Sequence, residues 1–353
     1  MHLVFWQPIP SFHQEGFLNE LAKQTWVDSV ELKVEQTLTD EFSNAGWRIP
    51  ELDGVECMQI RAKESPIDSV NHIHIFTGFQ THPLIWQSFD RLPKESKCRV
   101  FAYAEAPPEY GLAGLLRYLK YHWKARRLVV ALDGILAVGQ RGVDFYRRVS
   151  CSVDQVHRFA YYDKPLRNFP KLIEKAQNDR VEFLYVGRLI RLKGLGRLFR
   201  ALSKLNRPRT NWRLTVLGDG PCLVELQSLA EQLGLRQNIQ WQPSVPAEQV
   251  GAYYSNSDYL LQPSRADGWG MTIVEALRYG CEPIASTACG AVDAVRHECR
   301  LPTDRVKQWP EVLLRALESG ALSCVQRKTN TRRAEAYSAE AGVKQLKSIL
   351  FSD

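Results

Sequence analysis

Two carboxylates with seven residues between them, Asp267 and Glu275, lie in the segment ADGWGMTIVEA. The preceding residues, DYLLQP, predict a buried strand, and the apolar spacing that follows predicts a helix beginning at about Met271. Gly268 and Gly270 permit a sharp turn between strand and helix, and they let a ligand approach the backbone closely. Free amides and the helix dipole at a helix start attract anions. The segment therefore predicts a site for a phosphorylated ligand.

Each polar group of this segment has an expected role. A diphosphate would bind to the amides of Gly270, Met271 and Thr272. A carboxylate deep in such a pocket would repel phosphate, so Glu275 is expected to accept hydrogen bonds from a ribose diol instead. Asp267 lies in the loop, where it is placed to contact a sugar.

Basic residues and glycines follow two earlier predicted strands. The segment VGRLIRLKG contains Gly187, Arg188 and Lys193 directly after one strand, and GDGP begins with Gly218 at the end of another. Ligands of open α/β sheets bind at the carboxyl ends of the strands, and arginine binds phosphate with a forked geometry. Basic residues after a strand are also often solvated, and Asp-Gly-Pro is ordinary turn chemistry.

In order and spacing, these motifs resemble the retaining family 4 glycosyltransferases, group 1 enzymes with the GT-B fold. The matching segments are GRLIRLKG, GDGP, SDYLLQPS, PSRADGWGMTIVEALRYG and EALRYGCEPIAS. The resemblance implies a nucleotide-sugar donor on the carboxy-terminal domain and an acceptor mainly on the amino-terminal domain. It also implies retention of anomeric configuration. Bacterial enzymes of surface-polysaccharide synthesis are the members that the chain resembles.

Two departures from the family pattern bear on the donor. Asp267 stands where the family usually has Glu, and Pro243 stands where glycine is common, close to where such enzymes hold the nucleotide base. A UDP-sugar is the favoured donor. The expected donor-binding residues are Gly187, Arg188, Lys193, Gly218, Ser244, Val245, Gly268, Trp269, Gly270, Met271, Thr272 and Glu275.

No cofactor and no divalent metal are expected, since the nucleotide-sugar is a substrate and the chain has no Asp-x-Asp triplet. Arg188 and Lys193 would neutralise the leaving diphosphate in place of a metal. Fixed charges of this kind are usually the largest catalytic contribution.

The first half of the chain supplies weaker candidates for catalysis, to join Asp267. His13 follows the first predicted strand in PIPSFHQ, and Glu105 ends a later strand in RVFAYAEAP. His13 is expected either to contact donor or acceptor or to be a surface histidine. Glu105 is expected either to contact the sugar or orient the acceptor, or to be a solvated loop acid.

A basic helix is predicted near residues 113–127, with no acidic residue between Glu109 and Asp133. Its leucines form an apolar stripe beside the basic face, which is typical of a helix that lies on an anionic membrane. The alternative is a helix of the domain with a solvated basic face. The membrane-facing candidates are Arg117, Lys120, Trp123, Lys124 and Arg127.

Composition narrows the classes of protein. The 353 residues include 44% hydrophobic and 24% charged residues, which is ordinary for a folded protein of two domains. A net charge of +7 permits phosphorylated ligands, an anionic membrane or nucleic acid as binding partners.

No predicted strand is followed by GxGxxG, which argues against a nicotinamide oxidoreductase. No nucleic-acid module is visible, although a basic nucleotide- or nucleic-acid-binding protein remains the alternative from another class. A GT-B epimerase or phosphorylase is the nearer rival.

Short apolar runs alternate with amphipathic helical stretches along the chain, which predicts an α/β fold with two Rossmann-like, doubly wound domains. The resemblance implies that these domains face a central cleft, with residues 1–165 as the acceptor domain, 179–331 as the donor domain and a junction near Tyr161–Asp179. Residues 332–353 are predicted to form a terminal helix, Arg332–Phe351, and the resemblance implies that it crosses back to the first domain. The start of the chain reads as a strand and not a signal peptide. The expected location is the cytoplasm, with a peripheral position at the inner face of the cell membrane as the alternative.

Strands are predicted near His2–Trp6, Ser29–Val34, Val55–Ile60, His72–Phe76, Arg99–Ala104, Gly134–Val138, Val181–Val186, Arg213–Leu217, Asn238–Trp241, Asp258–Leu261 and Glu282–Ala285.

Overall fold

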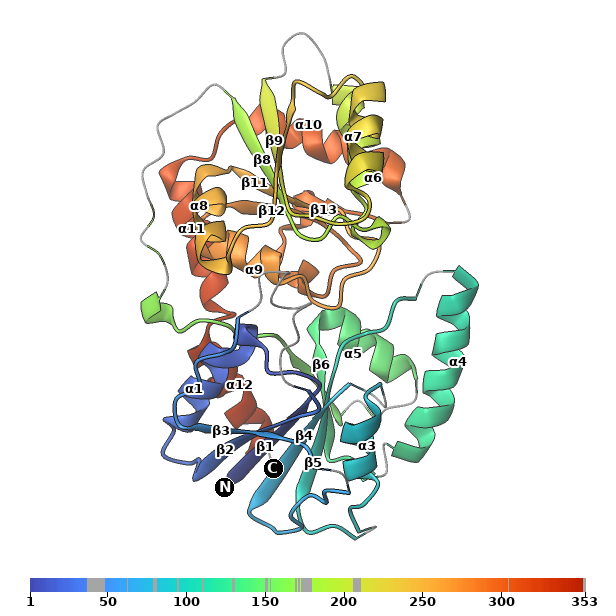
Figure 1. The fold of residues 1–353 in the computed structure, drawn as a ribbon, viewed down its shortest axis with the longest axis vertical. Helices are drawn as coiled ribbons and strands as arrows, with labels where there is room; N and C mark the ends of the chain where they lie inside the picture. Colours follow the sequence, from blue (N-terminus) through green and yellow to red (C-terminus); the bar gives the residue numbers. More distant parts are fainter. Residues whose placement is uncertain are drawn as a thin grey trace. The chain divides into compact units, whose positions relative to one another are not determined.

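The structure is a computed structural model that divides into two compact units (Figure 1). Unit 1 comprises Met1–Asn168 and Tyr337–Asp353, and unit 2 comprises Phe169–Ala336. The described residues are 1–36, 48–61, 63–78, 81–93, 95–109, 111–128, 131–149, 152, 154–168, 170, 172, 180–205, 211–303 and 305–351, without the side chains of 126–128. Part of the predicted junction Tyr161–Asp179 lies outside these residues.

Unit 1 is built on a parallel sheet that, within the described residues, has the strand order β3-β2-β1-β4-β5-β6-β7. The strands are β1 (His2–Gln7), β2 (Ser29–Val34), β3 (Val55–Gln59), β4 (His72–Thr77), β5 (Arg99–Ala104), β6 (Gly134–Val138) and β7 (Val156–Phe159). The helices are α1 (Glu15–Ala22), α3 (Pro83–Phe89), α4 (Gly111–Leu128), α5 (Gly139–Arg148) and α12 (Ala339–Leu350), with short 3-10 helices at η1 (Phe12–Gln14) and η3 (Leu166–Asn168).

Both faces of this sheet are covered, which is why β1 is apolar at successive positions instead of alternate ones. Trp6 stacks on Phe76 in the core that α3 and α5 complete. The next residue back, Phe5, points to the other face and packs edge-on against Phe17 of α1. α1 lies beside α12, so the last helix belongs to the core of unit 1.

α12 joins unit 1 through close packing and hydrogen bonds. The guanidinium of Arg99 donates to the carbonyl of Leu350 at 2.6 Å. A Cβ at Gly342 would lie 2.4 Å from the ring of Tyr162, so only glycine allows this approach. The predicted single helix Arg332–Phe351 is wrong. The chain forms α11 (Cys324–Glu335) and α12 instead, because Ser338 caps a new helix by accepting from the amide of Ala341 at 3.3 Å.

Unit 2 has a second parallel sheet, whose order within the described residues is β10-β9-β8-β11-β12-β13. The strands are β8 (Val181–Val186), β9 (Trp212–Leu217), β10 (Ile239–Gln242), β11 (Tyr259–Gln262), β12 (Glu282–Ser286) and β13 (Arg300–Leu301). The helices are α6 (Leu195–Leu202), α7 (Leu223–Gln232), α8 (Ala247–Asn256), α9 (Met271–Arg278), α10 (Trp309–Ser319) and α11, and the 3-10 helices are η4 (Arg191–Lys193), η5 (Ser203–Leu205), η6 (Gly290–Ala294), η7 (His297–Cys299) and η8 (Val306–Gln308).

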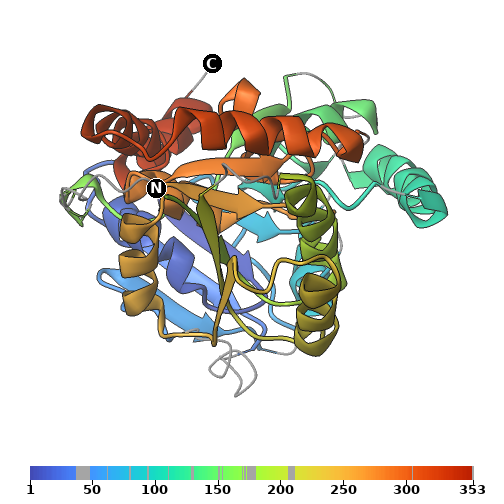
Figure 2. The ribbon, with the colours of Figure 1, turned by 90° about the horizontal axis from the view of Figure 1, so that it is seen from above.

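The sheet of unit 2 lies between α8 on one side and α7 on the other, as Figure 2 shows. Its strand order reverses between β8 and β11. Ligands of open α/β sheets bind at the carboxyl ends of the strands at this position. After β12 the chain forms the short 3-10 helix η6. Among the described residues, no helix combines the length and the apolar character that crossing a membrane requires.

Candidate active site

Glycines allow three loops of unit 2 to pack together at the carboxyl ends of β8, β9 and β11. Gly218, after β9, has φ +142°, and a Cβ there would lie 2.2 Å from the carbonyl oxygen of Gly187 after β8. Gly194 has φ +76°, and a Cβ there would lie 2.2 Å from the carbonyl oxygen of Pro263 after β11. Any larger residue would separate these loops. The loops bring Lys193 and Asp267 into contact, although 74 residues separate them in sequence.

Asp267 is held at one carboxylate oxygen by three donors. Its Oδ2 lies 2.7 Å from Nζ of Lys193, 2.9 Å from Nε2 of Gln262 and 3.3 Å from Oγ of Ser264. Gln262 and Ser264 are fully buried, whereas the side chains of Asp267 and Lys193 keep 14% and 22% of their surface exposed. The carboxylate is therefore fixed from the protein side while the ion pair still faces solvent.

The backbone of the Asp267 loop is fixed by the segment after β12. The amide of Asp267 donates to the carbonyl of Ala288 at 3.2 Å, and the amide of Gly290 donates back to the carbonyl of Asp267 at 3.1 Å. The amide of Ala291 donates to the carbonyl of Trp269 at 2.8 Å. These bonds set the direction in which the chain enters α9.

The start of α9 has the geometry that the sequence predicts for an anion site. Gly270 precedes the helix with φ +89°, which a side chain would disfavour. Within the described chain, the amides of Gly270, Met271 and Thr272 donate to no acceptor. The hydroxyl of Thr272 is buried and likewise has no partner among the described residues. Three free amides and one buried hydroxyl at a helix start can hold phosphate oxygens.

Glu275 lies one turn further along α9 and is oriented by α8. The hydroxyl of Tyr254 donates to Oε2 of Glu275 at 2.8 Å. Burial, together with the carboxylate of Glu275, raises the pKa of Tyr254 well above its usual value, so the phenol stays a donor. Glu275 is therefore held at one of its oxygens in the same way as Asp267.

Other predicted donor residues lie on neighbouring loops of the same sheet edge. Arg188 is exposed, its carbonyl accepts from the hydroxyl of Tyr185 at 3.0 Å, and within the described chain its guanidinium has no partner. Burial and then the charge of Asp267 raise the pKa of Tyr185 above its usual value. Ser244 follows β10, and its amide donates to Oδ2 of Asp219 at 2.6 Å. Val245 is half-buried beside it.

The two catalytic candidates of unit 1 follow strands that are not neighbours. His13 lies in η1 after β1, where its ring is tilted by 35° against the ring of Phe12, with 3.9 Å between the centroids. Glu105 follows β5 and is exposed, and its carbonyl accepts from the hydroxyl of Tyr146 at 3.0 Å. Burial and then the carboxylate of Glu105 raise the pKa of Tyr161 well above its usual value. Both candidates lie at the carboxyl edge of their sheet.

The two carboxylates are held by Gln262 and Tyr254, which are not among the predicted site residues. A polar residue at the end of the apolar strand YLLQ was a usable signal for Gln262, because strand ends of parallel sheets border ligand sites. Nothing local points to Tyr254, which lies 21 residues from its partner.

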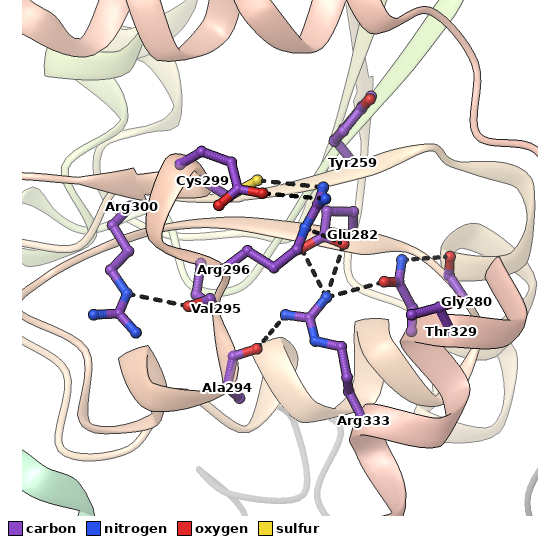
Figure 3. Close-up of polar contacts among 12 residues, drawn as sticks. Tyr259, Gly280, Glu282, Ala294, Val295, Arg296, Cys299, Arg300, Thr329 and Arg333 are labelled. Atoms are coloured by element: carbon purple, nitrogen blue, oxygen red, sulfur yellow. Dashed lines mark hydrogen bonds and ion pairs between the residues drawn. The ribbon is translucent and has the colours of Figure 1, made fainter. Parts of the chain in front are cut away.

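An ion-pair network around the buried carboxylate of Glu282, which was not predicted, supports the segment after β12 (Figure 3). Glu282, the first residue of β12, is 2% exposed and accepts from Nη1 of Arg333 at 2.9 and 3.0 Å. Its Oε2 also lies 3.2 Å from Nε of Arg296. Arg333 donates in addition to the carbonyl of Ala294, at the end of η6. The network ties α11 to the segment whose other end holds the Asp267 loop.

Comparison with known proteins agrees with this geometry. Residues 169–333, which lie within unit 2, match the family model described as "Glycosyl transferases group 1", so the resemblance predicted from the motifs is confirmed. The chain is 31% identical over 124 residues to a GDP-mannose-dependent alpha-(1-6)-phosphatidylinositol monomannoside mannosyltransferase of Mycolicibacterium smegmatis, covering 33% of this chain and 32% of the relative. It is 35% identical over 106 residues to a lipopolysaccharide 1,6-galactosyltransferase of Salmonella typhimurium, covering 30% of this chain and 29% of the relative. The matches thus span about a third of these relatives.

Solved structures resemble the chain along nearly its whole length. The apo form of the lipopolysaccharide outer core galactosyltransferase WaaB matches with a TM-score of 0.72 and 17% identity, covering 99% of each chain. HepE of Anabaena, in complex with UDP and glucose, matches with a TM-score of 0.66 and 14% identity, also covering 99% of each chain. At such identities the likeness concerns the fold, which is the GT-B fold predicted from the motifs.

Proposed function

We propose that this protein transfers a sugar from a nucleotide-sugar to a glycan or lipid-linked acceptor, with retention of anomeric configuration, in the synthesis of a cell-surface polysaccharide or glycolipid. The main support for the proposal is the site at the carboxyl ends of β8 and β11, where the strand order of unit 2 reverses. There an ion pair, Lys193 with Asp267, lies on the loops that adjoin the free amides at the start of α9.

The donor's diphosphate would bind to the amides of Gly270 and Met271 and to the cations Arg188 and Lys193. These groups are fixed before the reaction, so they stabilise the charge that develops on the leaving diphosphate without reorganising. They would do so without a divalent metal and without a cofactor. Glu275, held by Tyr254, would accept hydrogen bonds from the ribose diol.

The sugar would lie against Asp267, whose fixed carboxylate contacts a sugar hydroxyl. Retention would follow if the acceptor hydroxyl attacks from the face that the leaving group departs from, and no covalent nucleophile is assigned. His13 and Glu105 of unit 1 are proposed to contact the acceptor or orient it.

UDP is the favoured nucleotide. The HepE structure carries UDP and glucose, and a galactosyltransferase is among the relatives, while another relative is described as GDP-mannose-dependent. An epimerase or phosphorylase would use the same donor half-site, but neither appears among the proteins compared above. We propose no nucleic acid as a partner, because the proposed ligand contacts all belong to a nucleotide-sugar site.

Ligand binding tests this function most directly. Calorimetry with UDP, GDP, ADP, NAD and a DNA oligomer would identify the base, and slow hydrolysis of a panel of sugar nucleotides would identify the sugar. Arg188→Ala and Lys193→Ala should each weaken UDP binding by about 1.5–3 kcal/mol, because a charge-assisted contact is lost. Binding of uridine should stay within error.

Arg191→Ala is the matched control. Arg191 lies on the same loop, its side chain is 84% exposed and it pairs with Glu225 at 3.4 Å. Its replacement should therefore change the binding of neither UDP nor uridine. Equal losses for UDP and uridine in the Arg188→Ala and Lys193→Ala proteins would rule out the diphosphate assignment.

A further inference from the structure

α4 of unit 1 exposes its apolar residues to solvent instead of burying them. Large hydrophobic side chains with more than half of their surface exposed are concentrated on this one helix. They are Leu112 at 82%, Leu115 at 56%, Leu116 at 67%, Leu119 at 54% and Trp123 at 58%. Successive helical residues are about 100° apart, so these five side chains form one continuous stripe along the helix. Contiguous exposed apolar surface of this kind marks an interaction site.

The opposite side of α4 is packed against the protein, so the outward direction of the stripe is fixed. Gly114 and Ala125 are buried, and the ring of Tyr121 packs edge-on against Phe145 of α5 at 5.3 Å. The hydroxyl of Tyr118 donates to the carbonyl of Arg148 at 3.1 Å. α4 lies beside α5 at the margin of unit 1 in both views (Figures 1 and 2). The structure thus shows which face of this helix meets the protein.

Basic residues border the exposed stripe along one side. Lys120 is exposed and Lys124 half-exposed, and both lie between the stripe and the packed face. Arg117 lies on the same side, where its guanidinium donates to the carbonyl of Pro108 at 2.7 Å. α4 contains no acidic residue along its length. Arg127 continues the basic side in sequence, but its side chain lies outside the described residues.

From this arrangement we infer that α4 lies flat on an anionic lipid bilayer. The leucine stripe enters the acyl region, and Lys120 and Lys124 contact the lipid phosphates. An apolar face with a cationic border fits such a surface in both hydrophobicity and charge. A second copy of this chain fits worse, because a two-fold contact through the stripe would place each basic border against another with no acidic residue of α4 between them. The inference does not depend on the proposed transfer chemistry.

Sedimentation with vesicles tests the charge part of the inference. The full chain should bind vesicles that contain phosphatidylglycerol and bind vesicles of phosphatidylcholine alone much less, with binding reduced by salt. Lys120→Glu with Lys124→Glu should lower the partition coefficient by at least about tenfold. The control Arg236→Glu with Lys328→Glu makes the same change of charge at exposed positions of unit 2 and should bind like the parent.

The apolar part needs its own variants. Leu116→Ser with Leu119→Ser should lower partitioning about tenfold, whereas Val224→Ser with Val325→Ser, at exposed positions of unit 2, should have no effect. Brominated acyl chains should quench the fluorescence of the bound parent, and Trp123→Phe should remove most of that quenching. Quenching that is the same in the Trp123→Phe protein would overturn insertion of the stripe.

Two further results would overturn the inference. One is equal binding of the parent and the α4 variants to anionic vesicles. The other is a dimer of the parent in light scattering that the leucine variant abolishes, without vesicle binding by either protein. UDP binding should be measured for every variant as an independent check. A variant that no longer binds UDP would be misfolded, whereas a variant that binds UDP but not vesicles would be folded and defective in membrane binding alone.

Discussion

Nζ of Lys193 lies 2.7 Å from Oδ2 of Asp267, so the proposed phosphate-binding cation and the proposed sugar-binding carboxylate neutralise each other before any ligand arrives. A diphosphate that binds to Lys193 must therefore share it with the carboxylate. The two residues are coupled, and the effect of changing one depends on the other.

Asp267→Asn should separate binding from turnover. Removal of the negative charge leaves Lys193 free for phosphate, so UDP should bind as tightly as to the parent or more tightly. Turnover should fall by at least about tenfold, because an interaction made in the transition state affects kcat specifically. Single-turnover rates at saturating donor and calorimetry with UDP measure the two effects. A variant that turns over at the parent rate would remove Asp267 from the mechanism.

Gln262 should act through Asp267. Gln262→Leu removes the amide 2.9 Å from Oδ2, so the carboxylate loses one of its buried donors and its fixed orientation. We expect kcat to fall several-fold at unchanged UDP affinity, by roughly the 1 kcal/mol typical of one hydrogen bond. Gln240→Leu, at an exposed position of β10, should leave both quantities unchanged. A fall in UDP affinity as large as the fall in kcat would argue for a general loss of structure.

Glu275→Gln should weaken ribonucleotide binding selectively. The carboxamide keeps the shape but loses the charge that favours a ribose diol, at a cost of about 1.5–3 kcal/mol for UDP. The loss should be much smaller for 2′-deoxy-UDP, which lacks one hydroxyl. Calorimetry with both nucleotides measures the difference, and equal losses would exclude the ribose role.

Glu282→Gln should destabilise unit 2. It removes the buried charge that pairs with Arg333 and Arg296, whose side chains stay 24% and 43% exposed, and the loss of such charge-assisted hydrogen bonds costs about 1.5–3 kcal/mol in unfolding free energy. Glu298→Gln is the control, since Glu298 pairs with Arg296 at 3.2 Å but is 55% exposed, so it should cost less than about 1 kcal/mol. Urea denaturation compares the two. Similar urea midpoints for Glu282→Gln and Glu298→Gln would show that the buried carboxylate contributes no more to stability than the exposed one.

Acid should destabilise unit 1 through His74, a buried residue of β4, the strand between β1 and β5. Its Nδ1 accepts from Nε1 of Trp6 at 3.1 Å, so Nε2 donates to the carbonyl of Ile67 at 3.0 Å and the neutral ring is fully paired. Burial lowers the pKa of His74. The unfolded chain therefore binds the proton more tightly, and stability is lost as pH falls below the ordinary value of about 6.5.

Urea midpoints on either side of that pH measure this loss. His74→Gln should reduce the dependence without abolishing it, because burial also lowers the pKa of neighbouring His72. The same pH dependence in parent and variant would show that His74 does not contribute.

The strands were predictable because a fully buried strand is largely apolar and a half-buried strand alternates apolar with polar residues. Val181–Val186 is of the first kind and Ser29–Val34 of the second, and both match the predicted limits. β13 has only two residues, which is too short to give a pattern. The break before α12 had a signal in Ser338, a good helix cap, but the helical sequence on both sides masked it.

The site was predictable only where it is local in sequence. The turn around Gly270 and the helix behind it lie within one segment, so their geometry follows from residue types. The bonds that hold the carboxylates do not, because the phenol of Tyr254 and the ammonium of Lys193 reach their partners only through the packing of separate loops. Helical spacing likewise gave the stripe of α4 but not its outward direction.

Unit 1 is assembled from two stretches of chain, since α12 packs beside α1 and Arg99 donates to Leu350. During synthesis, the residues of unit 2 leave the ribosome before α12 does. Unit 2 is continuous and can fold as soon as it emerges, whereas unit 1, whose strands are made first, must wait with one side of its core open. Unit 1 is therefore translated first but completed last, after unit 2.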